Sequence, residues 1–273
     1  MDGTVPVDAN QLLKSEHEHQ VDELLKESFI NNPVETSINA YLIKTNNRLI
    51  LVDTGAGTLF NDSASGNILE SLGNAGYHPE QITDILLTHI HLDHSGGLTV
   101  NGKIQFPNAT IHVDQKEIDF WLKHENQDKH EPRGYTSNRP AFLTLKPYLK
   151  KGSVKTFEGA SELFLGLKSV PYYGHTFGHC AFVLESNSEK MVFLGDLVHI
   201  AAVQFHAPTL ANEFDFDKTK AAKQRKKIYA EASSENYLIA ADHIPFPGFG
   251  RLKKSNNGYE WIPVNFSSNG KTK

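Results

Sequence analysis

Apolar residues recur along this chain in short blocks separated by polar stretches, and the blocks predict strands and helices in alternation. Two apolar, β-branched runs, Ile38–Lys44 and Arg48–Val52, flank the turn sequence Thr45-Asn46-Asn47 and predict a hairpin. Ile82–Leu87 predicts a short buried strand, and Gly76 marks the end of a helix before it. The other predicted strands are Thr110–Val113, Ser153–Phe157, Leu163–Val170, Ala181–Glu185, Met191–Leu194 and Tyr237–Ala240, and the predicted helices are Asn67–Ala75, Gln115–Lys123 and Lys218–Ser233.

Two stretches depart from this pattern. Residues 1–36 are polar, and they are helix-like only over Gln11–Ser28. Residues 124–150 are polar, carry Pro132, Gly134 and Pro140, and predict an irregular insertion near the functional site. A long insertion in a compact domain is often functional, and a tolerated surface excursion is the alternative.

The alternation favours an α/β fold in a single domain over residues 1–273 with two similar halves. The 273 residues are 39% hydrophobic, which is enough to bury a sizeable core. The net charge of −5 argues against a protein that mainly grips phosphate backbones, and the basic stretch Lys218–Lys227 is interpreted as a solvated helix face. No apolar run is long enough to span a bilayer.

The chain holds one cysteine, Cys180, so no disulfide forms within it, and we expect a packing role for this residue. The first residues lack the basic and apolar regions of a signal peptide. The sequence starts abruptly, so we expect a processed or truncated N-terminus. The compartment therefore stays open between cytoplasm and periplasm or secretion.

The strongest chemical signal is His89-x-His91-x-Asp93-His94, which follows an apolar strand and precedes two glycines. Residues i and i+2 of an extended loop point the same way, so His89 and His91 can converge on one ion. Asp93 and His94, where the chain turns toward a helix, can face a second ion. Imidazole and carboxylate ligands suit zinc, and iron, manganese or cobalt fit as well. Packing alone explains three histidines and an aspartate in six residues poorly.

Further candidate ligands follow later predicted strands. They lie in Gly174-His175-Thr176-Phe177-Gly178-His179, in Leu194-Gly195-Asp196 and in Ala241-Asp242-His243. The carboxyl ends of strands are where α/β sheets place their chemistry. By contrast, His17-Glu18-His19 lacks a strand-loop context and is interpreted as solvated helix surface.

Together these motifs resemble the metallo-β-lactamase superfamily, and the resemblance covers nearly the whole chain. The stretches Ala241–Gly250 and Gly258–Val264 resemble in particular the branch that holds methyl parathion hydrolase, lactonases and aryl esterases. The resemblance implies an αββα sandwich of two central mixed β-sheets flanked by helices, with two divalent metal ions per chain at one edge.

Carried over by position, the resemblance implies that His89, His91 and His179 hold one metal and that Asp93, His94 and His243 hold the other. Asp196 would bridge both, and Asp93 and Asp196 are the carboxylates expected to take part in catalysis. Asp53 and His175 are expected to support the ligands through hydrogen bonds; a turn-forming aspartate is the alternative for Asp53. Phe177 stands where the family motif usually has proline.

Four residues are candidates for the substrate pocket: Phe60, Trp121, Phe142 and His199. The aromatic residues would hold a hydrophobic group of the substrate, and His199 would lie at the rim. Ordinary core packing is an equal alternative for Phe60 and Trp121.

The expected reaction is hydrolysis of a neutral, apolar ester, either a lactone or an aryl ester, by a hydroxide that bridges the two metals. A phosphotriester is the alternative substrate. A β-lactamase ranks lower and a nuclease lower still, and the non-enzymatic alternative is a metal-binding structural module. The expected partner is a small-molecule ester and not a nucleic acid, and a homodimer is left open.

Overall fold

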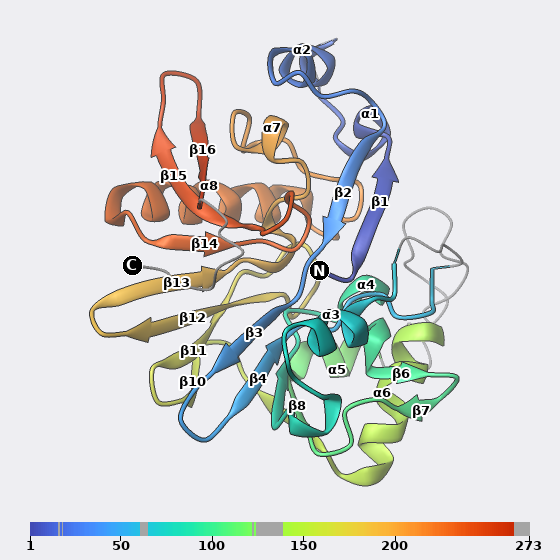
Figure 1. Ribbon diagram of the computed structural model, residues 1–273. Coiled ribbons are helices and arrows are strands. Elements are labelled where there is room, and N and C mark those ends of the chain that lie inside the picture. The colour runs from blue at the N-terminus through green and yellow to red at the C-terminus, as the bar shows by residue number, and fades with distance from the viewer. Residues whose placement is uncertain (16, 18, 61–64, 122, 124–138, 265–273) are drawn as a thin grey trace.

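The computed structural model describes residues 1–15, 17, 19–60, 65–121, 123 and 139–264, with side chains except those of 139–142. Its centre is a pair of mixed β-sheets packed face to face, and helices cover both outer faces (Figure 1). The αββα sandwich predicted from the sequence is therefore confirmed.

The sheet from the first half of the chain has five strands in the order β3-β4-β5-β8-β9. Strands β4, β5, β8 and β9 run parallel, and β3 is antiparallel to β4. The strands are β3 (Tyr41–Lys44), β4 (Leu49–Val52), β5 (Asp84–Leu86), β8 (Thr110–Asp114) and β9 (Val154–Phe157). Three helices accompany this half: α3 (Ile68–Asn74), α5 (Gln115–Trp121) and α6 (Arg139–Lys151).

The second sheet has seven strands, in the order of their numbering from β10 to β16. Neighbours are antiparallel except for β13 and β14, and helix α8 (Lys218–Glu235), which links those two strands, is the crossover that a parallel pair needs. The strands are β10 (Ser161–Phe164), β11 (Leu167–Pro171), β12 (Cys180–Ser186), β13 (Glu189–Phe193), β14 (Leu238–Ala240), β15 (Phe249–Lys254) and β16 (Tyr259–Pro263).

Alternating side chains of each central strand fill two different cores. In β12, Cys180 and Phe182 lie in the core between the two sheets, whereas Ala181 and Val183 lie in the core that includes residues of α8. Such alternation follows from the period of two in a strand. Both faces of β12 are buried in its first half, which explains why the sequence there is continuously apolar.

An N-terminal subdomain stands beside the sandwich. Strands β1 (Gly3–Val7) and β2 (Val34–Ile38) form an antiparallel pair, and the chain between them carries α1 (Ala9–Leu12) and α2 (Gln20–Glu27) (Figure 1). The sequence predicted one helix over Gln11–Ser28. The chain instead interrupts the helix before Gln20, where His19 adopts a left-handed backbone conformation with φ 63°. His17 and His19 are exposed, as expected for a solvated surface.

The short elements that remain connect the layers. They are η1 (Pro79–Gln81), α4 (Leu92–Ser95), η2 (Gly96–Leu98), β6 (Thr99–Val100), β7 (Lys103–Ile104), η4 (Gly195–Leu197) and α7 (Ala201–Gln204).

Two segments that were each predicted as one strand contain parts of two strands. The predicted strand Ile38–Lys44 breaks at Asn39, whose side-chain amide donates to the carbonyls of Ala241 and Ile244 at 3.2 and 2.8 Å. The predicted strand Leu163–Val170 is a tight hairpin, because Gly166 takes φ 76° and reverses the chain between β10 and β11. Strands β1, β6, β7, β15 and β16 were not predicted, and of β2 only Ile38 was.

The prediction that residues 124–150 are irregular is wrong for residues 139–150. Residues 139–151 form α6 although Pro147 lies inside the helix, and residues 124–138 lie outside the described part. Leu145 and Tyr148 are fully buried, and the Tyr148 hydroxyl donates to the carbonyl of Leu98 at 3.0 Å. This burial outweighs the low helix propensity of proline.

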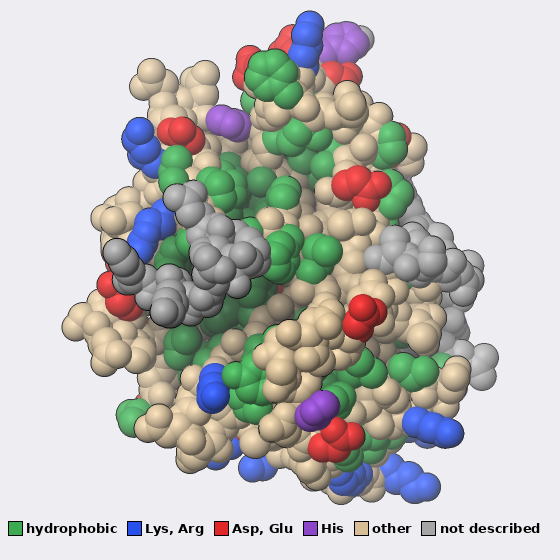
Figure 2. Space-filling model, viewed as in Figure 1, with side chains coloured by type: hydrophobic (Ala, Val, Ile, Leu, Met, Phe, Trp, Pro, Cys, Tyr) green, Lys and Arg blue, Asp and Glu red, His purple; other side chains and the backbone are tan. Residues whose placement is uncertain are grey.

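On the face shown in Figure 2, hydrophobic side chains gather toward the middle, and lysines and arginines lie mostly toward the margins. Among the helices that the structure describes, none combines the length and the apolar composition needed to cross a membrane.

The buried carboxylate of Asp2 fastens the N-terminal strand to the loop after β4. It accepts the backbone N–H groups of Ala56, Gly66 and Ile68 at 2.9–3.0 Å. In the same loop, the carbonyl of Gly55 accepts a hydrogen bond from the N–H of Gly97 at 3.0 Å. Residue 2 therefore supports the backbone that lies against the segment of His89 to Gly97.

We expect Asp2→Ala to lower the free energy of unfolding by about 1–3 kcal/mol, because buried N–H groups lose their acceptor. Urea unfolding would show a lower midpoint with an unchanged slope. Glu27→Ala, which removes an exposed carboxylate from the end of α2, is the control and should change stability by no more than about 0.5 kcal/mol. Equal effects of the two substitutions would contradict the role given to Asp2.

Candidate metal centre

The loops that follow β5, β11, β13 and β14 meet at one edge of the sandwich and carry the predicted ligands. His89 and His91 follow β5, Asp196 lies in η4 just after β13, and His243 follows β14. The carboxyl ends of parallel strands open at the same edge of a sheet, which is why sequence-distant side chains can meet there.

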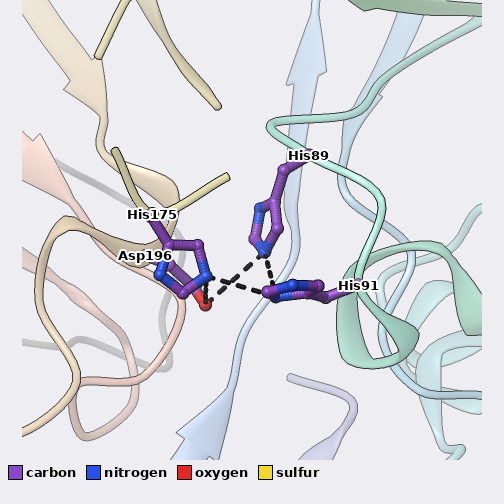
Figure 3. A group of neighbouring side chains, drawn as sticks. All are labelled: His89, His91, His175 and Asp196. Atoms are coloured by element: carbon purple, nitrogen blue, oxygen red, sulfur yellow. Dashed lines mark hydrogen bonds and ion pairs between the residues drawn. The ribbon is translucent and has the colours of Figure 1, made fainter. Parts of the chain in front are cut away.

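One group of ligand atoms consists of His89 Nε2, His91 Nδ1, His175 Nε2 and Asp196 Oδ2. These side chains point toward one another from three loops, since His89 and His91 share one (Figure 3). His91 Nδ1 lies 2.9 Å from His89 Nε2 and 3.2 Å from His175 Nε2. Asp196 Oδ2 lies 3.1 Å from His175 Nε2 and 3.6 Å from His89 Nε2.

A second group lies on the other side of the same carboxylate. Asp93, His94 and His243 bring their ligand atoms together, with His243 Nε2 at 3.5 Å from Asp93 Oδ2. The second oxygen of Asp196, Oδ1, lies 3.0 Å from His94 Nε2 and 3.1 Å from His243 Nε2. The two oxygens of Asp196 thus face two different groups, which is the arrangement that a bridging ligand needs.

The unsatisfied atoms of the site fit cations. Within the described residues, His94 Nε2 and Asp196 Oδ1 are buried and have no hydrogen-bond partner of suitable geometry. Such atoms are costly unless a cation or another partner binds them. Burial opposes a charge on His175 and His243, yet the Asp196 carboxylate raises the pKa of each to about 9. The local field therefore favours positive charge on both sides of Asp196.

Most ligand candidates are held by a partner at their other nitrogen. His175 Nδ1 lies 2.9 Å from Asp215 Oδ1, and His94 Nδ1 lies 2.9 Å from Asp53 Oδ2. His243 Nδ1 lies 2.9 Å from the carbonyl of Ser37. An acceptor at one nitrogen fixes the ring orientation and presents the other nitrogen as a ligand. Asp53 thus lies where the supporting role predicted for it requires.

The structure exchanges the predicted roles of His175 and His179. His175 belongs to the three-histidine group, whereas His179 Nε2 accepts the backbone N–H of Asp196 at 3.1 Å. His179 Nδ1 lies 3.3 Å from the carbonyl of Tyr172, so both ring nitrogens are occupied by the backbone. Burial, aided by the nearby His175, lowers the pKa of His179 to about 3 and keeps it neutral. We therefore assign the ligand role to His175 and a backbone-bracing role to His179.

His199 lies deeper in the site than the predicted rim. Its Nε2 is 3.1 Å from Asp196 Oδ2, and its ring stacks on His243 at 4.7 Å. Asn212 fixes its tautomer: the Asn212 oxygen accepts the N–H of Phe214, so its amide nitrogen donates to His199 Nδ1 at 2.9 Å. Nε2 of neutral His199 then carries the proton and offers a donor to the site. His199 also shares a group of candidate ligand atoms with Asp196 and His243.

The aromatic residues predicted to line the substrate pocket lie in different parts of the structure. Trp121 is 2% exposed and belongs to the core beneath the site, with its ring edge-on to His91 at 5.4 Å. Two phenylalanines of the ligand loops are each 51% exposed: Phe177, and Phe246 three residues after His243. Phe177 packs on Phe120 at 4.5 Å and on Phe216 at 5.3 Å. Phe60 is half-buried in the loop after β4, and the side chain of Phe142 lies outside the described residues.

Sequence reasoning missed two acids that support the ligands. Asp215 binds His175, and Asp242 Oδ2 lies 3.1 Å from His94 Nδ1. Burial and the neighbouring Asp53 raise the pKa of Asp242 well above its usual range. Its place next to His243 was a usable signal. Asp215, in contrast, lies in a polar loop with nothing local to distinguish it.

Comparison with known sequences and structures gives concordant matches. Residues 33–254 match the family model described as the metallo-beta-lactamase superfamily. The chain is 29% identical over 172 residues to an N-acyl homoserine lactonase of Bacillus thuringiensis, which covers 56% of this chain and 60% of that protein. It is 24% identical over 210 residues to a probable metallo-hydrolase of Mycobacterium bovis, with 69% and 63% covered. The chain thus spans about 60% of the length of the curated relatives it matches.

Two solved structures are similar over nearly their whole length. The hydrolase AbOPH, of the beta lactamase superfamily, is 37% identical with a TM-score of 0.91, covering 98% of this chain and 93% of that one. AidC, a dizinc quorum-quenching lactonase solved with a product, N-hexanoyl-L-homoserine, is 30% identical with a TM-score of 0.89 and the same coverage.

We expect His175→Ala and His179→Ala to separate the two roles. After reconstitution with zinc, His175→Ala should lose one of two metals per chain, because it removes a ligand of one group. His179→Ala should keep both metals but lower the unfolding midpoint, since the N–H of Asp196 loses its acceptor. Elemental analysis of both purified variants measures this. Full metal content in His175→Ala, with loss in His179→Ala, would restore the original assignment.

Proposed function

This chain belongs to the metallo-beta-lactamase superfamily, and from that premise we propose that it is a dinuclear metal-dependent hydrolase of neutral, apolar esters, with lactones as its leading substrates. The observation that carries the proposal is the carboxylate of Asp196, whose two oxygens each face a separate group of ligand atoms. The likeness to AidC and to the Bacillus thuringiensis lactonase supports the choice of lactones.

We propose two divalent metal ions per chain, with zinc first and iron, manganese or cobalt as alternatives that the same donor set accepts. His89, His91 and His175 would hold one ion, Asp93, His94 and His243 the other, and Asp196 both. When bound, two such ions supply a hydroxide nucleophile at neutral pH and polarise the bond that is attacked. This assignment differs from the sequence-based one only in the third histidine of the first group.

The side chains around the metals have separate tasks. The outer acids Asp215 and Asp53 keep the ligand imidazoles in fixed orientations. His199 presents an N–H toward Asp196 and can donate it to an oxygen of the substrate. The thiol of Cys180 is excluded as a nucleophile, because burial raises its pKa well above the usual range and its side chain packs between the sheets.

Apolar substrates fit the aromatic surface beside the three-histidine group. Phe177, which lies two residues after His175 and next to Gly178, exposes half of its surface and is supported by Phe120 and Phe216. A side chain in this position can cover an acyl or aryl group of a substrate held at the metals. The metals thus support the hydrolysis of esters, and Phe177 supports the preference for apolar substrates.

Arginines that could clamp a phosphate dianion are absent from the described side chains near the site. Arg48 binds Asp84, Arg225 donates to the carbonyl of Leu197, and Arg251 donates to that of Asn236. A neutral phosphotriester needs no such clamp, so it stays the alternative substrate, and a phosphomonoester does not fit.

A substrate panel on zinc-reconstituted protein tests the proposal. We expect N-acyl lactones to be hydrolysed fastest, aryl esters and phosphotriesters more slowly, and β-lactams least. Removal of metal by a chelator should abolish every activity, and added zinc should restore it. Turnover that survives complete metal removal would refute the metal-dependent mechanism. If a phosphotriester is hydrolysed faster than every lactone, phosphotriesters become the leading substrates and lactones the alternative.

Phe177→Ala should raise KM for long-chain acyl lactones about five-fold, since one aromatic contact contributes about 1 kcal/mol. Metal content and the KM for short-chain lactones should be unchanged. Phe29→Ala, which removes a phenylalanine that is 97% exposed and follows α2, is the matched control. An equal change in KM for short and long chains would show that Phe177 does not contact the acyl group.

A further inference from the structure

A buried glutamate on α5 joins the two loops that carry the three-histidine group. Glu117 is fully buried. Its Oε2 accepts the backbone N–H of Ile90 at 2.8 Å, and Ile90 lies between His89 and His91. Its Oε1 accepts the backbone N–H of Gly178 at 2.8 Å and the hydroxyl of Thr176, the residue after His175. One side chain thus spans both ligand loops.

The bonding pattern of Glu117 requires a carboxylate. The fourth donor is the indole N–H of Trp121, which reaches Oε2 at 2.7 Å. Each oxygen therefore accepts two hydrogen bonds. A glutamine in the same place would lose hydrogen bonds whichever way its amide was flipped: an N–H₂ facing Ile90 and Trp121 would lose both, and one facing Gly178 and Thr176 would lose the bond from Gly178, because only the Thr176 hydroxyl can also accept.

The same contact explains why residue 178, in the loop that carries His175, is a glycine. A Cβ on Gly178 would lie 2.8 Å from Glu117 Cγ and 2.7 Å from its backbone nitrogen. The absence of a side chain at position 178 therefore allows the loop to approach α5 closely enough for the hydrogen bonds to form. The second glycine of the Gly174–His179 motif serves this approach rather than a left-handed turn.

Packing alone does not account for a charge at this position. Among the described residues, Glu117 forms no ion pair, although burial of a carboxylate is costly unless hydrogen bonds or a cation compensate. An apolar side chain would fill the space at lower cost but would bind neither loop. The presence of an acid at this buried position indicates a role in holding the loops.

We propose that Glu117 is a positioning residue that fixes the separation of the His89–His91 loop from the His175 loop and so preorganises the three-histidine metal site. It does not contact the ligand atoms themselves; it acts through the backbone of Ile90 and Gly178. The proposal rests on the metal centre of the proposed function but not on its substrate. None of the hydrogen bonds of Glu117 reaches Asp93, His94 or His243 themselves, so we expect this second group to stay in place when Glu117 is changed.

Cadmium-113 NMR of the fully loaded protein tests this site by site. Two resonances are expected from wild type, and the one lost in His175→Ala belongs to the three-histidine site. Glu117→Gln should shift that resonance, leave the other in place, and weaken metal binding at the first site about 10- to 100-fold in competition with a chelator. Trp121→Phe removes one donor and keeps the carboxylate, so it should move the same resonance less.

The matched control is Asp84→Asn. Asp84 is a buried carboxylate at the start of β5, bonded to His112 and Arg48 at the opposite end of the strand from the ligands. It should lower stability without moving either resonance. Unchanged spectra and affinities in both Glu117→Gln and Trp121→Phe would overturn the proposal, as would an equal shift in Asp84→Asn. If Glu117→Gln does not fold, Trp121→Phe decides alone. Wild-type protein that binds fewer than two cadmium ions would instead refute the dinuclear centre.

Discussion

The buried carboxylate of Asp196 constrains the whole edge of the sandwich. Removing a charge from water costs several kcal/mol unless partners surround it, and here the partners are imidazoles from four separate loops. Those loops leave strands of both sheets. The sheets must therefore present their carboxyl edges to each other at a spacing that one carboxylate can bridge. The close approach at Gly178 and the acids behind the histidines serve the same spacing.

Local sequence predicted the parts of this site that are local in structure. His89 to His94 form one loop after one strand, so spacing alone indicated which of them fall into the same group of candidate ligand atoms. The choice between His175 and His179 was beyond such reasoning, since both lie in the same turn with the same flanking glycines. Asp215 selects His175, and the N–H of Asp196 occupies His179. Both partners are remote in sequence, and only the folded chain brings them together.

The same limit explains the errors in the fold. Prolines and polar residues in 124–150 favoured an irregular segment, but burial of Leu145 and Tyr148 stabilises α6 against that preference. The antiparallel pair of β1 and β2 has only short apolar runs. Its attachment to the loop after β4 depends on Asp2, which looks like any surface acid in the sequence. Glu117 is similar: in a predicted helix it resembles a solvated charge, and its four donors come from three segments of the chain. The central strands, apolar on both faces, were found because their own composition determines their burial.

The placement of the ligands has a thermodynamic consequence for the whole chain. His89 and His175 are 86 positions apart by their numbers, and His243 lies farther on, so a cation held by such residues cross-links both sheets. An ion that binds the native chain but not the unfolded one stabilises the native state by mass action. At a free concentration 1,000 times its dissociation constant, one ion contributes about 4 kcal/mol, a large fraction of the 5–15 kcal/mol typical of a folded protein. Metal supply would then determine how much folded protein is present, as well as how active it is.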